Sequence, residues 1–104
     1  MTLGEFLAEE ASDLPGIASS TDGDGATTWS RGGRPFAALV ADGSAAEFSL
    51  DPAVAAAALR TPDVAPSARG SGWVTFAPAE LDDHAVDRAR AWFASAHRRL
   101  GPRD

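Results

Sequence analysis

The chain has 104 residues and a formal net charge of −6, a size typical of one domain with a single core. It contains no cysteine, which excludes disulfides, thiol chemistry and zinc–thiolate sites. No apolar run approaches the roughly 18 residues of a membrane span, and the N-terminus lacks a basic start followed by an apolar core. We therefore expect residues 1–104 to form one domain of a cytoplasmic protein without a membrane segment.

The charge is distributed unevenly along the chain, and all nine basic residues are arginine. Residues 1–50 carry eight acids and two arginines, whereas residues 51–104 carry seven of each. An acidic chain is a poor general binder of polyanions, because contacts to phosphate supply much of the affinity for nucleic acid. Any basic face is therefore expected to draw mainly on the second half of the chain.

The N-terminal segment predicts a helix over residues 2–12, because its apolar residues recur at helical spacing. Thr2 with Glu5 three residues later is typical of a capping box. Pro15 ends the helix, since the residue before a proline avoids the α conformation. A loop rich in Ser, Asp and Gly is expected from there to residue 25.

Three strand-like runs follow, over residues 26–31, 34–40 and 44–50. The Gly32-Gly33 pair between the first two predicts a two-residue hairpin turn. That turn places Arg31 opposite Arg34.

The same hairpin register places Trp29 opposite Phe36, and Pro35 opposite Ser30, where its missing N–H costs nothing to the ladder. For the second turn a three-residue loop over 41–43 is preferred to a two-residue loop, because it brings apolar residues opposite one another. The resulting core face is predicted to contain Trp29, Phe36, Ala38, Val40, Ala46, Phe48 and Leu50.

The second half predicts a short helix at residues 51–60 and a weak strand near Val64. A further strand is predicted at 72–78 and a long helix at 82–99. Asp51 is expected to cap the short helix, with Pro52 at its first position. The order α-β-β-β-α-β-β-α predicts an α+β fold of two layers. Its antiparallel sheet has about five strands, with helices packed mainly on one face.

The element order and several short strings resemble the MmcQ/YjbR-like family over roughly residues 14–100. The strings are LPG (14–16), W (29), GG (32–33), FA (36–37), DP (51–52), GWV (72–74) and AW…A (91–96). The resemblance implies a small domain of α-β₃-α-β₂-α type. It also implies DNA binding by a double-wing arrangement, in which hairpin or loop tips act as the wings. Arg34 takes the position after the hairpin glycine where that family usually has lysine.

The candidate nucleic-acid-binding residues are Arg31, Arg34 and Arg69. Like charges directly opposite each other destabilise a strand pair, so an anion is expected beside Arg31 and Arg34. This anion is expected to be one of three groups: a carboxylate of the chain itself, a group of a partner, or a phosphate. Arg69 lies in a second loop tip, and all three are expected to touch phosphates if the domain binds DNA.

A further stripe on the last predicted helix interleaves arginine and aromatic residues with spacings of four, three and four, at Arg88, Trp92, Ser95 and Arg99. This pattern suits nucleic acid or an acidic protein surface. We favour the structural interpretation, in which the arginine stems cover the edge of the core and Trp92 is buried beneath them.

No catalytic, metal or cofactor site is predicted. The TDGDG string (21–25) resembles a calcium loop, but Arg31 stands where a bidentate glutamate is needed, so a flexible loop is favoured. His84 and His97 are thirteen residues apart on one predicted helix, about 20 Å, and cannot share a metal. His97 is expected to interact with the helix dipole. No nucleophile elbow or phosphate loop is present.

The sequence thus favours a small non-enzymatic binding domain, with weak, phosphate-mediated binding of DNA through its hairpin and loop tips. The alternative is a protein-interaction module or a homodimerising domain that does not bind nucleic acid.

Overall fold

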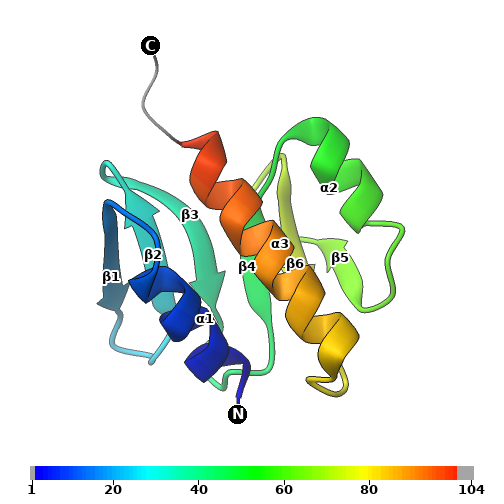
Figure 1. Ribbon diagram of the computed structural model, residues 1–104, viewed down its shortest axis with the longest axis horizontal. Helices are drawn as coiled ribbons and strands as arrows, with labels where there is room; N and C mark the ends of the chain where they lie inside the picture. The colour runs from blue at the N-terminus through cyan, green and yellow to red at the C-terminus, as the bar shows by residue number, and fades with distance from the viewer. Residues whose placement is uncertain (1, 101–104) are drawn as a thin grey trace.

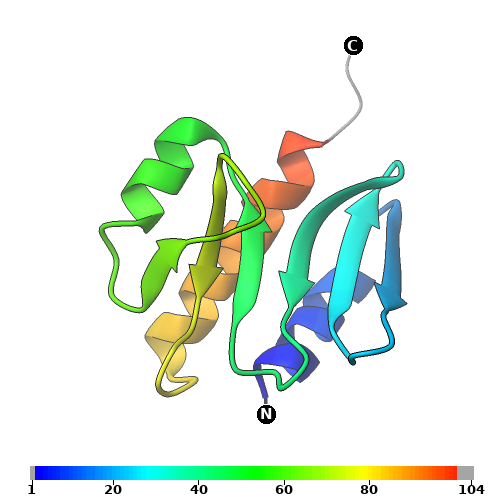
Figure 2. The same ribbon diagram turned by 180° about the vertical axis from the view of Figure 1, so that it is seen from behind.

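The computed structural model describes residues 2–100. Its helices and strands are, in chain order, α1 (Leu3–Ser12), β1 (Ile17–Thr21), β2 (Thr27–Arg31), β3 (Arg34–Leu39), β4 (Ala46–Ser49), α2 (Pro52–Ala58), β5 (Val64–Pro66), β6 (Trp73–Phe76) and α3 (Asp83–Arg99). The strands form one antiparallel sheet in the order β1-β2-β3-β4-β6-β5. Helices α1 and α3 cross one face of it (Figure 1), and the view from behind shows strands without a covering helix (Figure 2).

The predicted α+β fold with an antiparallel sheet and helices mainly on one face is confirmed. The sheet has six strands, however, because β1 forms within the segment expected to be a loop. Its sequence, IASST, lacks the apolar alternation of a half-buried strand, and most of it is exposed. Pairing with β2 along its whole length makes it a strand.

Two of the three helices begin with a side-chain cap, and the third lacks one. The Thr2 hydroxyl accepts a hydrogen bond from the Glu5 N–H, and the Glu5 carboxylate accepts one from the Thr2 N–H, which completes the predicted capping box. Asp82 caps α3 by accepting from the Ala85 N–H at 2.8 Å. Asp51 precedes α2 but makes no side-chain capping bond, contrary to expectation, and its carboxylate instead pairs with Arg99 at 3.2 Å.

The predicted hairpin turn is correct, but the register beyond it is not. Arg31 faces Arg34 and Pro35 faces Ser30, as expected. Trp29 pairs with Ala37 rather than Phe36, because a β-bulge leaves Phe36 as an extra residue. The bulge turns both Phe36 and Ala37 into the core.

The bulge also changes the second turn. Val40 N–H donates to the Ala45 carbonyl at 3.0 Å, so residues 41–44 form a four-residue connection instead of the predicted three-residue loop. Ala38 therefore faces Glu47; it is buried as predicted but lies outside the apolar core cluster. Val40 is half-buried and also lies outside that cluster. One inserted residue reverses which side chains point inward.

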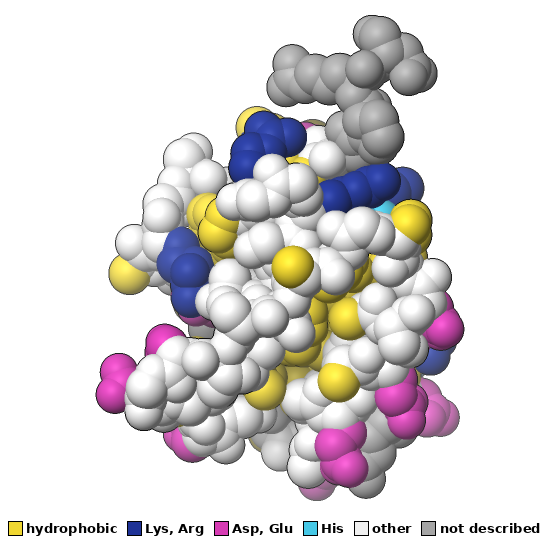
Figure 3. All heavy atoms as spheres, turned by 90° about the vertical axis from the view of Figure 1, so that its left-hand side faces the viewer, with side chains coloured by type: hydrophobic (Ala, Val, Ile, Leu, Met, Phe, Trp, Pro, Cys, Tyr) yellow, Lys and Arg dark blue, Asp and Glu magenta, His cyan; other side chains and the backbone are white. Residues whose placement is uncertain are grey.

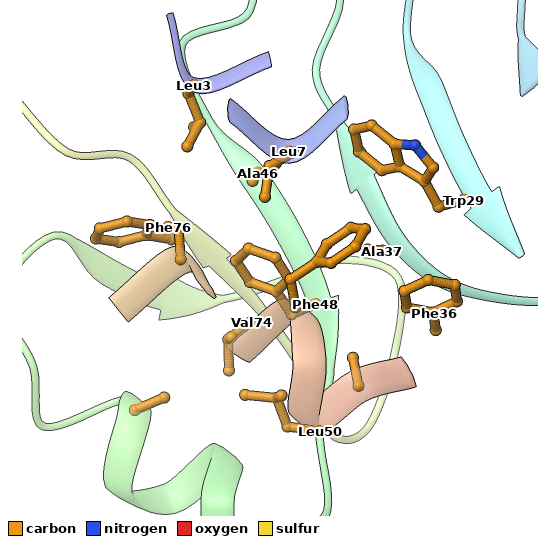
Figure 4. Close-up of a cluster of buried hydrophobic side chains, with 14 of the residues drawn as sticks. Leu3, Leu7, Trp29, Phe36, Ala37, Ala46, Phe48, Leu50, Val74 and Phe76 are labelled. Carbon is orange, nitrogen blue, oxygen red and sulfur yellow. The ribbon is translucent and has the colours of Figure 1, made fainter. Parts of the chain in front are cut away.

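The core lies between the sheet and helices α1 and α3. Figure 4 shows Phe48 and Phe76 of β4 and β6 within one cluster with Leu7 of α1. On the side of β2 and β3, the Phe93 ring of α3 meets Trp29 and Phe36 edge-to-face, with centroids 5.5 and 5.3 Å away. None of the helices within residues 2–100 is long and apolar enough to cross a membrane.

Candidate functional site

The two arginines that face each other across the β2–β3 turn have different surroundings. The Arg31 side chain is half-buried, and its Nη1 donates to the His97 carbonyl oxygen at 3.0 Å. Arg34 is exposed and makes no ion pair within residues 2–100. The electronegative group beside Arg31 is therefore a backbone carbonyl in the last turn of α3 and not a carboxylate of the described residues. The same carbonyl also accepts from the Leu100 N–H at 3.2 Å.

His97 joins the hairpin to the first loop. Its Nδ1 lies 3.2 Å from Arg31 Nη1, and its Nε2 lies 2.8 Å from the Pro15 carbonyl oxygen. Because a guanidinium can only donate, Nδ1 is the acceptor, and the imidazole proton is on Nε2, where it is donated to Pro15. The ring is buried and packs edge-to-face on Phe36. His97 therefore has a structural role in the core, which its spacing of four residues after Phe93 could have indicated.

Arg69 lies in the connection between β5 and β6, which crosses over β4 and β6 in the view from behind (Figure 2). Its Nε pairs with the Glu47 carboxylate at 2.8 Å, and its guanidinium stacks over the Trp73 ring, 5.2 Å from the centroid. The hydroxyls of Ser67 and Thr75 donate to the same carboxylate. Burial raises the pKa of this carboxyl, but the Arg69 guanidinium and the two hydroxyls outweigh burial and hold its pKa below the ordinary value.

The three predicted arginines thus do not form one basic surface. Arg31 and Arg34 lie together at the β2–β3 tip, whereas Arg69 is neutralised by a carboxylate above β4 and β6. Arg90 and Arg99 also pair with acids of the chain, with Glu10 at 3.2 Å and Asp51 at 3.2 Å.

The arginine–aromatic stripe of α3 fits the structural interpretation in part, because Trp92 packs on the core but is only half-buried. The Trp92 ring meets Phe76 edge-to-face at 5.1 Å and packs against the core cluster. Arg99 reaches back to the sheet and donates to the Ser49 hydroxyl at 3.0 Å.

The aspartates of TDGDG form a turn between β1 and β2. The Asp22 carboxylate accepts from the N–H groups of Asp24 and Ala26, at 2.9 and 3.1 Å, which is an Asx-type turn. Residues 2–100 contain no group of three or more histidines and acids placed to hold a metal ion.

A shallow cavity of about 230 Å³ lies at the start of α3. It is lined by Asp63, Phe76, Pro78, Ala79, Glu80, Asp82, Ala85 and Arg88. One of its acids, Asp82, is already used as the cap of α3.

A feature that the sequence interpretation missed is the free edge of the sheet at β1. The Asp22 N–H donates to the Ala26 carbonyl at 2.9 Å, which marks a hydrogen-bonded pair at the end of the β1–β2 ladder. Such pairs alternate along an antiparallel ladder. Ala18 and Ser20 therefore bond to β2 through their backbone groups, in the register in which they face Ser30 and Thr28.

By the same alternation, the N–H and C=O groups of Ile17, Ser19 and Thr21 point away from the sheet. β1 is the end strand of the sheet, and no backbone bond outside the β1–β2 ladder reaches these groups within residues 2–100. The opposite edge strand, β5, has only three residues and ends in Pro66. Proline and short length protect an edge against pairing, whereas β1 has five residues with neither proline nor charge.

Comparison with known proteins assigns neither a family nor a function, since no family model and no curated protein matches this chain. The MmcQ/YjbR-like resemblance therefore stays a prediction.

Proposed function

We propose that this chain is a non-enzymatic protein-interaction domain that binds an extended strand along the free edge of β1. The observation that carries the proposal is the outward row of backbone groups at Ile17, Ser19 and Thr21, which no described residue covers. Main-chain hydrogen bonds supply affinity when a strand adds to a sheet edge. Natural proteins usually protect such an edge, so an unprotected edge favours a binding role.

A second candidate is weak binding of duplex DNA through the β2–β3 tip, as the family resemblance implies. The observation that favours it is the exposed Arg34, beside Arg31 and without an acidic partner within residues 2–100. Two of the three candidate arginines, Arg31 and Arg69, are engaged within the chain. The net charge of −6 also opposes approach to phosphate.

The family resemblance and the cytoplasmic location remain part of the proposal. The α-β₃-α-β₂-α order of the family corresponds to α1, β2–β4, α2, β5–β6 and α3, with β1 added at the edge. The added strand is the one that carries the proposed binding edge.

A Ser19→Pro variant tests the proposal, because it removes an outward N–H and leaves the N–H groups that bond to β2. In pull-downs from nuclease-treated extracts of the source cells, we expect the wild-type chain to recover a protein partner. Ser19→Pro is expected to lose at least about tenfold of that recovery. Arg34→Ala serves as the matched control and is expected to recover as much as wild type.

The opposite pattern would contradict the proposal. Recovery that Ser19→Pro leaves unchanged would place the partner elsewhere on the domain. Duplex DNA binding at low salt that disappears in Arg34→Ala would favour the second candidate.

A further inference from the structure

We infer that the strand that binds along β1 is β1 of a second copy of this chain, antiparallel and related by a twofold axis at Ser19. The inference rests on the proposed function, since both need the β1 edge to be free. It goes further by naming the partner and the register.

The outward groups of β1 are suited to pairing with themselves. They belong to Ile17, Ser19 and Thr21, and in an antiparallel pair centred on Ser19 each outward residue faces another outward residue. Ser19 then faces its own copy, and Ile17 faces Thr21 of the partner. Each facing pair exchanges two hydrogen bonds, which gives about six across the interface. If the twofold axis lay one residue away from Ser19, one of the three outward residues of each copy would have no outward residue opposite it.

The charges at the two ends of β1 favour the antiparallel direction. The Ile17 end lies beside Arg31 of β2, and the Thr21 end leads into the turn of Asp22 and Asp24. Viewed toward this side of the molecule, arginine side chains lie mainly in the upper half and acidic ones in the lower half (Figure 3). Antiparallel pairing brings the basic end of each copy to the acidic end of the other.

The same arrangement accommodates the net charge of each copy. The two copies carry −6 each, but repulsion between distant charges is screened beyond about 8–10 Å at physiological salt. The strand itself carries no charge, so no like charges face each other across the axis. Twofold dimers are also the commonest closed assemblies.

An interface of one strand edge is small, so the dimer is expected to be weak, with a dissociation constant of micromolar order or higher. Concentration therefore decides how much dimer forms. Covalent trapping is the suitable measurement, and the chain has no cysteine to interfere with an introduced one.

The experiment compares Ser19→Cys with Ala18→Cys in a glutathione redox buffer at about 1 mM protein. In the inferred dimer the two Ser19 Cα atoms lie about 5.5 Å apart, within the range that a disulfide spans. The two Ala18 Cα atoms are offset by two strand positions and lie roughly 8 Å apart, beyond that range. Both positions are exposed. We expect the equilibrium fraction of disulfide dimer to be at least about tenfold higher for Ser19→Cys.

Equal trapping of the two variants would overturn the inference, because parallel or unspecific contact brings both positions together. An absence of trapping in Ser19→Cys beyond that seen in urea would overturn it as well. Either result leaves the proposed function standing if Ser19→Pro loses a different protein partner in the pull-down. If that pull-down shows no dependence on Ser19, the proposed function itself is wrong.

Discussion

Replacing Phe93 by alanine is expected to lower the free energy of unfolding by about 3–5 kcal/mol. The ring is buried and is the edge-to-face partner of both Trp29 and Phe36. Its removal leaves a cavity at the point where α3 packs on the bulged hairpin. Urea denaturation followed by tryptophan fluorescence measures the change.

Phe93→Leu is the matched control, because it keeps an apolar side chain of intermediate size at the same position. We expect it to lose only about 1–2 kcal/mol. Equal and small losses for the two variants would show that α3 does not close the core over Trp29. Since small domains have about 5–15 kcal/mol of stability in total, a loss of this size removes a large share of it, and the urea midpoint of the alanine variant is expected to fall well below that of the wild type.

Arg31→Ala is expected to cost about 2–3 kcal/mol of unfolding free energy. It removes the donor to the His97 carbonyl and leaves the buried Nδ1 of His97 without a hydrogen bond. Arg34→Ala, directly across the turn, is expected to change stability by less than about 0.5 kcal/mol, because its side chain is exposed. Thermal or urea unfolding of the two variants measures the difference.

This pair separates a structural arginine from a surface arginine at one hairpin tip. A similar small effect in both variants would mean that the contact between Arg31 and α3 contributes nothing in solution. If Arg34→Ala were the more destabilising variant, the surroundings described for the two side chains would be contradicted.

Local signals in the sequence predicted the positions of the helices and the turn of the first hairpin, although not the register beyond that turn. The capping box at Thr2, the Asp82 start of α3 and the Gly32-Gly33 turn each depend on residues that are close together in the chain. Such features need no knowledge of the tertiary structure, and the structure confirms them.

The sequence could not indicate the features that depend on distant partners. The polar strand β1 forms because β2 offers a ladder, and the bulge at Phe36 forms because two consecutive residues can both be buried against α3. The contact between Arg31 and His97 spans 66 residues of sequence. No periodicity or spacing within the hairpin reveals that the carbonyl end of α3 lies beside it.

The central claim, that the β1 edge is free and pairs with another strand, is tested most directly by amide hydrogen exchange across a range of protein concentrations. In dilute solution the N–H groups of Ala18 and Ser20 are expected to exchange slowly and those of Ile17, Ser19 and Thr21 quickly, because only the first set bonds to β2. At high concentration the second set is expected to become protected as well. Outward amides that exchange equally fast at every concentration would contradict pairing with a second copy. Outward amides already protected in dilute solution would show that the edge is not free.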